Sequence, residues 1–213
     1  MAQTVFHGAP ADSARAVCVF THGRGQSPEE MIETVLARVD APEVRFALPR
    51  APRDAWYDAR AVDPLTEATR AQLDAALDQL RQTITDTRAA CPGLPLVVAG
   101  FSQGACLSAE YLLRGGMADA AVLLTGCRVG TAGDHPPLPA LGAMPVYASN
   151  GDTDPWIAPM PWAQMAGALA QAGARLRCDI LPGRAHEVSE TECATFSAML
   201  DALSLKQPLW EGR

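Results

Sequence analysis

The chain has 213 residues, a formal net charge of −7 and an ordinary apolar share of 48%. A chain of this length is within the range of one α/β domain, so we expect a single domain over residues 1–213. The negative charge disfavours a nucleic-acid partner, because the 17 lysines and arginines are scattered and phosphate contacts need clustered cations.

The N-terminal segment and the cysteines limit the class of protein further. Residues 1–7 have neither a basic region nor a long apolar core, and no later run approaches the roughly 18 apolar residues that a membrane span needs. We therefore expect a cytoplasmic protein without a membrane span. The six cysteines form no Cys-x-x-Cys pair, so we expect reduced, mostly buried thiols, with no disulfide framework and no metal site.

Short apolar runs alternate along the chain with longer segments whose apolar residues recur every three or four positions. This alternation is typical of an α/β fold, in which helices cover both faces of a mostly parallel central sheet. The strands are predicted at Ala16–Phe20, Val44–Leu48, Leu96–Ala99, Ala121–Leu124, Val146–Ser149 and Leu176–Ile180.

Capping signals indicate where the helices begin and end. The first helix is predicted to have Ser27 as N-cap, Pro28 at its first position and Glu30 completing a capping box, with an apolar face that continues to Val39. The others are predicted after Asp63-Pro64, from about Gln103 to Gly115-Gly116, from about Ala158 to Ala172 with Gly173 as the left-handed stop, and from Ser189, boxed by Glu192.

Two loops are longer than a connection requires, Pro49–Asp63 and Cys127–Gly142. Long loops in a compact domain are often functional. In an open parallel sheet the ligand site lies beyond the carboxyl ends of the strands. We therefore look for chemistry in the loops that follow strands.

A Gly-x-Ser-x-Gly sequence, Gly100 to Gly104, directly follows a predicted strand and directly precedes a predicted helix. This is the context of a nucleophile elbow, a turn so sharp that the residues two before and two after the serine must lack side chains. Ser102 is therefore the predicted nucleophile. The non-catalytic alternative is a glycine-rich turn in which the serine has no chemical role.

A serine hydroxyl needs a base, usually a histidine, held by a carboxylate. For this fold the chain order is Ser, then Asp or Glu, then His, which excludes His7 and His22 as the base. His135 lies in the middle of a loop rich in Gly and Pro, before the last two strands. His186 lies between the final strand and the final helix, and together with the elbow it is the predicted base.

The acid is expected after the strand Val146–Ser149, where two aspartates compete. Asp152 lies in a turn, where an aspartate commonly bonds its own backbone. Asp154, followed by Pro155, is placed to project from a rigid loop, although it could instead cap the next helix. The pattern alone leaves both residues open.

The oxyanion of an acyl-transfer intermediate needs two N–H donors. We expect them from the backbone of Gln103, after the serine, and of Arg24, whose neighbouring glycines let its amide turn toward the pocket. His22 is then more plausible as a structural hydrogen-bonding residue than as a proton shuttle. The guanidinium of Arg24 either meets an anionic substrate or, as we favour, is solvated.

Five segments stand in the order and spacing of one known family. The segments are His22-Gly23-Arg24-Gly25, Ala55-Trp56-Tyr57-Asp58, Gly100-Phe101-Ser102-Gln103-Gly104, Gly151-Asp152-Thr153-Asp154-Pro155 and Gly183-Arg184-Ala185-His186. Through them the chain resembles, over nearly its whole length, the phospholipase/carboxylesterase family of α/β-hydrolases, whose relatives include acyl-protein thioesterases.

The resemblance implies a single-domain α/β-hydrolase fold and hydrolysis of carboxylic esters or thioesters without cofactor or metal. It also implies that Asp154, the second aspartate of its motif, is the acid, and that the segment with Trp56 and Tyr57 borders the site. With Trp156, these are the candidate substrate-binding residues. Two departures from the family pattern are Ala105, where many relatives have glycine, and Ile157-Ala158-Pro159 at the pocket rim.

The sequence thus predicts a serine carboxylesterase for small-molecule esters of short to medium acyl groups, acting through an acyl-enzyme. Alternatives within catalysis are a dienelactone or lactone hydrolase and an acyl-protein thioesterase, since one triad serves several acyl substrates. From a different class comes a hydrolase-fold protein that binds a ligand without turnover. The sequence predicts no oligomeric state.

Overall fold

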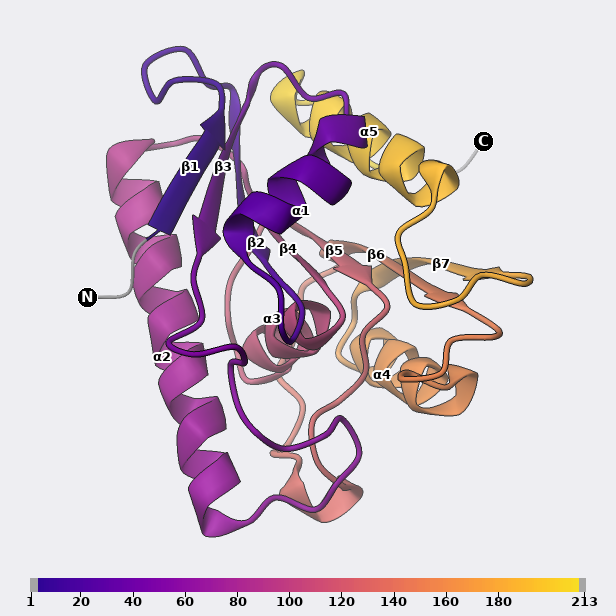
Figure 1. The fold of residues 1–213 in the computed structure, drawn as a ribbon. Helices are drawn as coiled ribbons and strands as arrows, with labels where there is room; N and C mark the ends of the chain where they lie inside the picture. The colour runs from indigo at the N-terminus through magenta and orange to yellow at the C-terminus, as the bar shows by residue number, and fades with distance from the viewer. Residues whose placement is uncertain (1–3, 211–213) are drawn as a thin grey trace.

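The computed structural model of the protein describes residues 4–210. Over these residues the chain forms one seven-stranded sheet in the order β1-β3-β2-β4-β5-β6-β7, and all neighbouring strands are parallel except β1 and β3 (Figure 1). The strands are β1 (Thr4–Gly8), β2 (Ala16–Thr21), β3 (Val44–Pro49), β4 (Leu96–Phe101), β5 (Ala120–Leu124), β6 (Pro145–Gly151) and β7 (Arg175–Leu181). The predicted α/β fold with a mostly parallel sheet is confirmed.

All six predicted strands are present, and their ends lie within two residues of the predicted ones. Each of β2, β4 and β5 is buried along its whole length, which explains why an unbroken apolar run identifies it. The sequence pattern does not predict β1, because this short antiparallel edge strand is mostly exposed and contains no long apolar run.

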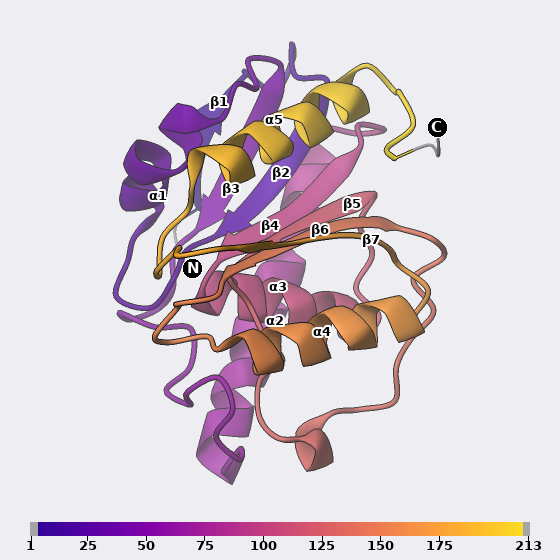
Figure 2. The ribbon, with the colours of Figure 1, turned by 90° about the vertical axis from the view of Figure 1, so that its right-hand side faces the viewer.

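Helices cover both faces of the sheet, as predicted. Figure 2 shows α1 and α5 on one side of the strands, with α2, α3 and α4 on the other. The helices of residues 4–210 are α1 (Pro28–Thr34), α2 (Glu67–Ala90), α3 (Gln103–Leu113), α4 (Pro159–Gln171) and α5 (Glu190–Ser204), with short 3-10 helices at Leu36–Arg38 and Ala132–Asp134.

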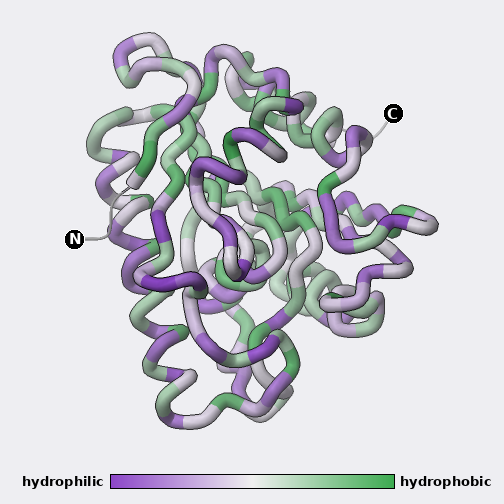
Figure 3. The backbone as a smooth tube through the Cα atoms, viewed as in Figure 1, coloured by the Kyte–Doolittle hydropathy of each residue, from purple (hydrophilic) through white to green (hydrophobic). Residues whose placement is uncertain are grey.

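The core has two halves, one on each face of the sheet. Toward α5, the ring of Phe196 stacks on Phe20 and meets Phe46 edge-on, with centroids 6.2 and 6.5 Å apart. Toward α2 and α3, leucines such as Leu77 and Leu107 pack on the opposite face. In Figure 3 the central strands are mostly hydrophobic, whereas α2 alternates between hydrophobic and hydrophilic residues, as a helix with one buried face requires.

The capping signals are confirmed in part. Ser189 and Glu192 form the predicted box at the start of α5, and Gly173 has a positive φ of 87° just after α4. At α1 the N–H of Glu30 bonds Ser27 Oγ at 3.2 Å, without the predicted return bond from the Glu30 carboxylate among residues 4–210.

The first helix is also shorter than its apolar face suggests. It ends at Thr34, and Val35, with a φ of −118° and a ψ of −61°, is the C-cap that precedes a separate 3-10 turn. Two adjacent β-branched residues, Thr34 and Val35, weaken helix propensity at this point. The prediction of one continuous helical face as far as Val39 is therefore wrong.

The sheet register brings the carboxyl ends of four strands to one edge. Thr21 of β2 pairs with Gly100 of β4, Phe101 pairs with Leu124 of β5, and Leu124 pairs with Ser149 of β6. Arg24, Ser102 and Asp154 follow β2, β4 and β6, and His186 follows β7, whose Leu181 pairs with Gly151 of β6. The fold therefore gathers at one edge of the sheet residues that are far apart in the sequence.

Two features bear on the expected class of protein. None of the helices in the described part of the chain has the length and apolar character needed to cross a bilayer. Five of the six cysteines are buried, in agreement with the prediction of mostly buried thiols, and Cys178 is exposed. The buried sulfur atoms of Cys106 and Cys127 lie 3.9 Å apart.

Candidate active site

Ser102 occupies the sharp turn between β4 and α3. Its φ of 56° and ψ of −121° lie in a backbone region that residues other than glycine rarely adopt. Backbone strain of this kind is typical of functional turns. The N–H of Ser102 bonds the carbonyl of Leu124 at 2.9 Å. A Cβ added at Gly100 would lie 2.4 Å from Thr21 Oγ1, so the turn requires glycine there, as the elbow pattern predicts.

The hydroxyl of Ser102 points to the imidazole of His186. Oγ of Ser102 lies 2.8 Å from Nε2 of His186, and Nδ1 of the same ring lies 2.8 Å from Oδ2 of Asp154. A carboxylate only accepts hydrogen bonds, so the Asp154 contact places the imidazole proton on Nδ1. Nε2 is then free to accept the serine proton, which is the arrangement that makes a serine nucleophilic.

Asp154, and not Asp152, contacts the histidine. Besides His186, Asp154 accepts hydrogen bonds from the backbone N–H groups of Trp156 and Ile157 on its Oδ1, both at 2.8 Å. Asp152 instead accepts a bond from the N–H of Gly183 at 2.6 Å, which ties two loops together. Of the two aspartates that the sequence leaves open, only Asp154 has the geometry of a triad acid.

The remaining candidate histidines bond backbone groups. Nδ1 of His22 donates to the carbonyl of Gly23 at 2.8 Å, and its Nε2 accepts from the N–H of Ala51 at 3.1 Å. Burial lowers the pKa of His22, which favours the neutral ring that this pair of bonds requires. Nε2 of His135 lies 3.2 Å from the carbonyl of Val129. The structural role expected for His22 matches this geometry.

The backbone amides of Arg24 and Gln103 are available for an oxyanion. No group among residues 4–210 accepts a hydrogen bond from either N–H. The loop that holds Arg24 also abuts the serine, since a Cβ added at Gly23 would lie 3.2 Å from Cβ of Ser102. Two unpaired donors next to a reactive hydroxyl are what an oxyanion hole needs.

The side chain of Arg24 is exposed, and one of its nitrogens bonds the backbone of a neighbouring loop. Its Nη2 donates to the carbonyls of Tyr57, Asp58 and Ala59 at 3.0, 3.3 and 2.8 Å. The exposure of Arg24 agrees with the expected solvated guanidinium, but the three bonds from Nη2 to carbonyls of one loop are not predicted from the sequence. Arg24 holds that loop against the site.

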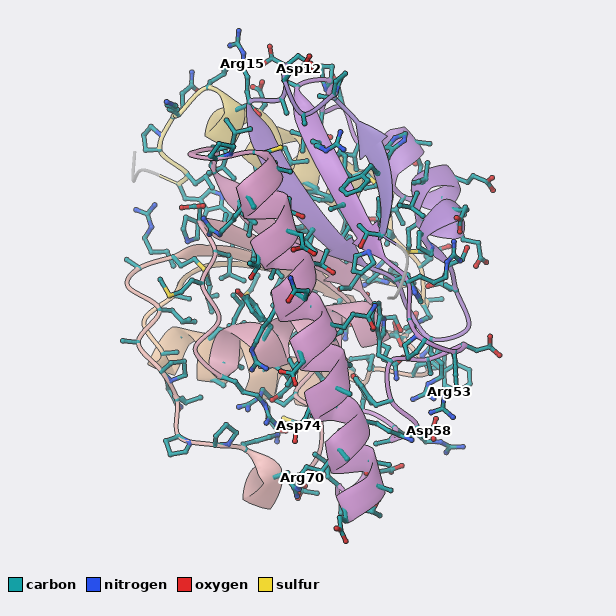
Figure 4. All side chains as sticks on the ribbon, turned by 90° about the vertical axis from the view of Figure 1, so that its left-hand side faces the viewer. Asp12, Arg15, Arg53, Asp58, Arg70 and Asp74 are labelled. Carbon is teal, nitrogen blue, oxygen red and sulfur yellow. The ribbon has the colours of Figure 1, made fainter. Side chains whose placement is uncertain are left out.

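The side chain of Gln103 holds the same loop, a role that the sequence does not suggest. Its Oε1 accepts from the N–H of Trp56 at 3.0 Å, and its Nε2 donates to the carbonyl of Tyr57 at 2.8 Å. On the outer surface of this loop, Arg53 and Asp58 form an ion pair at 3.3 Å, and their side chains lie together in Figure 4.

The three aromatic residues predicted to bind substrate have different environments. The side chains of Trp56 and Tyr57 are 2% and 1% exposed, and Nε1 of Trp56 donates to the carbonyl of His22 at 2.8 Å. Their burial disfavours direct contact with a substrate. Trp156, which is 75% exposed and two residues from Asp154, remains available for such contact.

A groove of about 380 Å³ lies beside the histidine. Its apolar lining includes Phe101 and Val188, and Arg38 and Glu187 are among its polar residues. A larger hollow of about 480 Å³, between residues 40–44 and α5, is lined by none of Ser102, Asp154 and His186. The groove that includes His186 is therefore the better candidate for a substrate subsite.

Comparison with known proteins gives one family. A model of the phospholipase/carboxylesterase family matches residues 4–204. The crystal structure of a phospholipase/carboxylesterase from Dyadobacter fermentans DSM 18053 has 26% identity and a TM-score of 0.83, and the match covers 94% of this chain and 96% of that one. A search of the curated proteins finds no match.

More distant structures share the fold alone. Esterase PE8 has 22% identity over 95% of this chain and 99% of that one, with a TM-score of 0.78. Acyl-protein thioesterase 2 from Zea mays has 19% identity over 96% of this chain and all of that one, with a TM-score of 0.72. The fold class predicted from the sequence, an α/β-hydrolase, is that of these structures.

Proposed function

The chain belongs to the phospholipase/carboxylesterase family, and from this premise we propose that it is a serine carboxylesterase for small esters of short to medium acyl groups. The observation that carries the proposal is the unbroken hydrogen-bond chain from Asp154 through His186 to Ser102, with both contacts at 2.8 Å. Such a series of hydrogen bonds allows the serine oxygen to lose its proton as it attacks a carbonyl carbon.

In the acylation step, Oγ of Ser102 attacks the ester carbonyl while Nε2 of His186 takes the hydroxyl proton. The carbonyl oxygen becomes an oxyanion, which accepts hydrogen bonds from the N–H groups of Arg24 and Gln103. The imidazolium is stabilised by the buried carboxylate of Asp154. His186 then gives its proton to the leaving oxygen, the alcohol departs, and an acyl ester remains on Ser102.

In the deacylation step, water takes the place of the alcohol. His186 removes a proton from the water, whose oxygen attacks the acyl carbonyl, and the same two N–H groups bind the second oxyanion. Collapse of this intermediate returns the proton to Oγ of Ser102 and releases the carboxylic acid. Water is the only co-reactant that the sequence of steps consumes.

The proton transfers assign the two parts of the ester to two surfaces. His186 must reach the leaving oxygen, so the alcohol portion lies on the histidine side, where the groove with Phe101 and Val188 begins. For the acyl portion we propose the exposed Trp156, two residues from Asp154, as the apolar surface that it contacts.

An organophosphonate probe tests the proposal against a binding protein without turnover. The wild type is expected to form a covalent adduct located by mass spectrometry on Ser102, and to hydrolyse p-nitrophenyl butyrate. Ser102→Ala removes both, whereas Ser13→Ala, on an exposed loop, keeps both. Acyl-CoA thioesters and lactones in the same assay separate the alternative substrate classes. A wild type that neither reacts with the probe nor turns over any of these substrates contradicts the proposal.

A further inference from the structure

Arg184 lies two residues before His186, in the loop between β7 and α5, and its side chain turns back onto that loop. It is 5% exposed. Its Nη1 donates to the carbonyl of Ala185 at 2.7 Å and also to the carbonyl of Glu187. One guanidinium nitrogen therefore binds the carbonyls on both sides of His186.

The other end of the guanidinium is fixed by neighbouring elements. Its Nη2 donates to Oγ1 of Thr125, just after β5, at 2.6 Å. The same nitrogen lies 3.4 Å from Oε1 of Glu192, in the first turn of α5. The backbone carbonyl of Arg184 accepts a bond from Oγ1 of Thr153, the residue before Asp154, at 3.0 Å. Arg184 thus connects the loop of His186 to the loop of Asp154.

Glu192 is itself held in place. It is 0% exposed, and it accepts hydrogen bonds from the hydroxyl of Ser149 at 2.5 Å and from the N–H of Ser189 at 2.7 Å. A buried carboxylate needs a partner cation, and Arg184 supplies it. The guanidinium therefore has a fixed anchor on the far side of the loop that it holds.

We propose that Arg184 is a positioning residue that holds the imidazole of His186 within reach of both Ser102 and Asp154. The inference rests on the proposed function, because it assigns a role in the same reaction. Backbone bonds hold the loop only sparsely, at the N–H groups of Gly183, Arg184 and Glu187. The guanidinium of Arg184 supplies hydrogen bonds to the loop backbone that a strand or a helix would otherwise provide.

The chain contains a matched control, a second buried Arg–Glu pair away from this loop. Nε of Arg128 donates to Oε1 of Glu110 at 2.6 Å, and both side chains are buried. Glu110 lies on α3, and Arg128 follows β5. Substitution of Arg128 disturbs the same kind of ion pair without touching the carbonyls beside His186.

The test compares Arg184→Lys with Arg128→Lys. Each lysine keeps a positive charge near its glutamate, but its single compact ammonium cannot replace the two separated nitrogens with which a planar guanidinium reaches acceptors on different elements. For Arg184→Lys we expect kcat for p-nitrophenyl butyrate to fall about 10- to 100-fold with little change in KM, since small displacements of a catalytic group are costly. Arg128→Lys should lower the thermal midpoint by a similar amount and keep kcat within about threefold of the wild type.

A milder pair of variants covers the case in which Arg184→Lys does not fold. Thr125→Val removes the hydroxyl that binds Nη2 but keeps the shape of the side chain, and Thr125→Ser keeps the hydroxyl. Thr125→Val is expected to lower kcat, and Thr125→Ser to restore most of it. A purely structural role for the arginine would make the two variants alike in kcat after correction for the folded fraction.

A proton resonance gives a readout that needs no substrate. The proton on Nδ1 of His186, bonded to Asp154, is expected to give a far-downfield signal in the wild type and in Arg128→Lys, and a broadened or absent signal in Arg184→Lys. An unchanged signal together with unchanged kcat in folded Arg184→Lys overturns the proposal. Absence of esterase activity and of probe labelling in the wild type would instead contradict the proposed function, while the resonance still tests the positioning.

Discussion

The backbone of Gly104 lies so close to that of Thr21 that a Cβ added at Gly104 would be 2.1 Å from the Thr21 carbonyl oxygen. Neither group is the end of a flexible side chain, so one backbone segment has to move. We expect Gly104→Ala to lower the free energy of unfolding by about 1–3 kcal/mol or more and to abolish most ester hydrolysis, because it separates the Ser102 turn from the loop of Arg24. Chemical unfolding and initial rates measure the two effects.

Gly167 supplies the control for this substitution. It lies within α4, is exposed, and a Cβ added there would meet no atom within 4 Å. Gly167→Ala should raise stability by about 0.5–1 kcal/mol, because glycine in a helix interior loses more conformational freedom than alanine. A Gly104→Ala protein as stable and active as Gly167→Ala would contradict the close approach to Thr21.

Replacement of Asp154 should damage catalysis far more than replacement of Asp152. In Asp154→Asn the single oxygen is claimed by the N–H groups of Trp156 and Ile157, so the amide NH2 faces Nδ1 of His186. The imidazole proton then moves to Nε2, which can no longer accept from serine, and we expect kcat to fall about 10³- to 10⁴-fold. Steady-state kinetics of the purified variant give this number.

Asp152→Asn is the paired control, because its amide oxygen can still accept the bond from the N–H of Gly183. Its activity should stay within about tenfold of the wild type, since no proton position on the imidazole changes. Losses of the same size in both variants would show that the two loops matter only as a unit.

The parts of the fold that the sequence predicts are those that local chemistry decides. The buried strands appear as apolar runs. Ser102 is identified by the glycines on either side of it, Gly100 and Gly104, at positions with no room for a Cβ. His186 follows from chain order once the serine is known. The choice between Asp152 and Asp154 depends on which carboxylate turns toward the ring of His186, which is 32 residues from Asp154, and the pattern of residues does not contain that direction.

The parts that the sequence does not predict depend on side chains that fold back over long distances. Trp56 and Tyr57 are buried because the amide of Gln103 and the guanidinium of Arg24 bind the backbone of their loop. No local sequence pattern predicts such contacts. In the same way, nothing in the loop sequence around Arg184 predicts that its charged side chain is buried, where it lies beside the carboxylate of Glu192.

Acidification should destabilise the protein through His22. Burial lowers the pKa of this ring in the folded state, so between about pH 7 and 5 the unfolded chain binds more protons than the folded one. Stability contributed by the neutral ring is therefore present above the unfolded pKa and is lost as pH falls. Urea unfolding at pH 7 and pH 5 measures the loss.

His22→Asn isolates this contribution. The amide can keep the bond to the carbonyl of Gly23 and does not titrate, so the variant should be less stable than the wild type at pH 7 but lose less stability between pH 7 and 5. His135, whose pKa burial also lowers, leaves a residual slope in both proteins. An identical pH slope in the wild type and His22→Asn would show that the ring takes up its proton without unfolding.

The two tryptophans near the site should affect different properties. Trp56 is buried and bonds the carbonyl of His22, so Trp56→Phe leaves that carbonyl unpaired and is expected to lower stability by about 1–3 kcal/mol without altering the preference for acyl length. Trp156→Ala is expected to leave stability nearly unchanged and to alter the preference. Thermal unfolding and kcat/KM for a series of p-nitrophenyl esters distinguish the two.

The acyl-length profile itself should rise from acetyl to a maximum between butyryl and octanoyl and fall at palmitoyl. An enclosed methylene would contribute about 0.8 kcal/mol, but Trp156 is 75% exposed, so a chain lying on it buries one side only and gains less per carbon. Beyond the indole a long chain meets solvent, and further carbons add little.

In Trp156→Ala, kcat/KM for the octanoyl ester should fall about tenfold and that for the acetyl ester should hardly change. A wild-type rise that continues to palmitoyl, measured below the aggregation limit of each ester, would refute the short-to-medium preference and favour a depalmitoylating role.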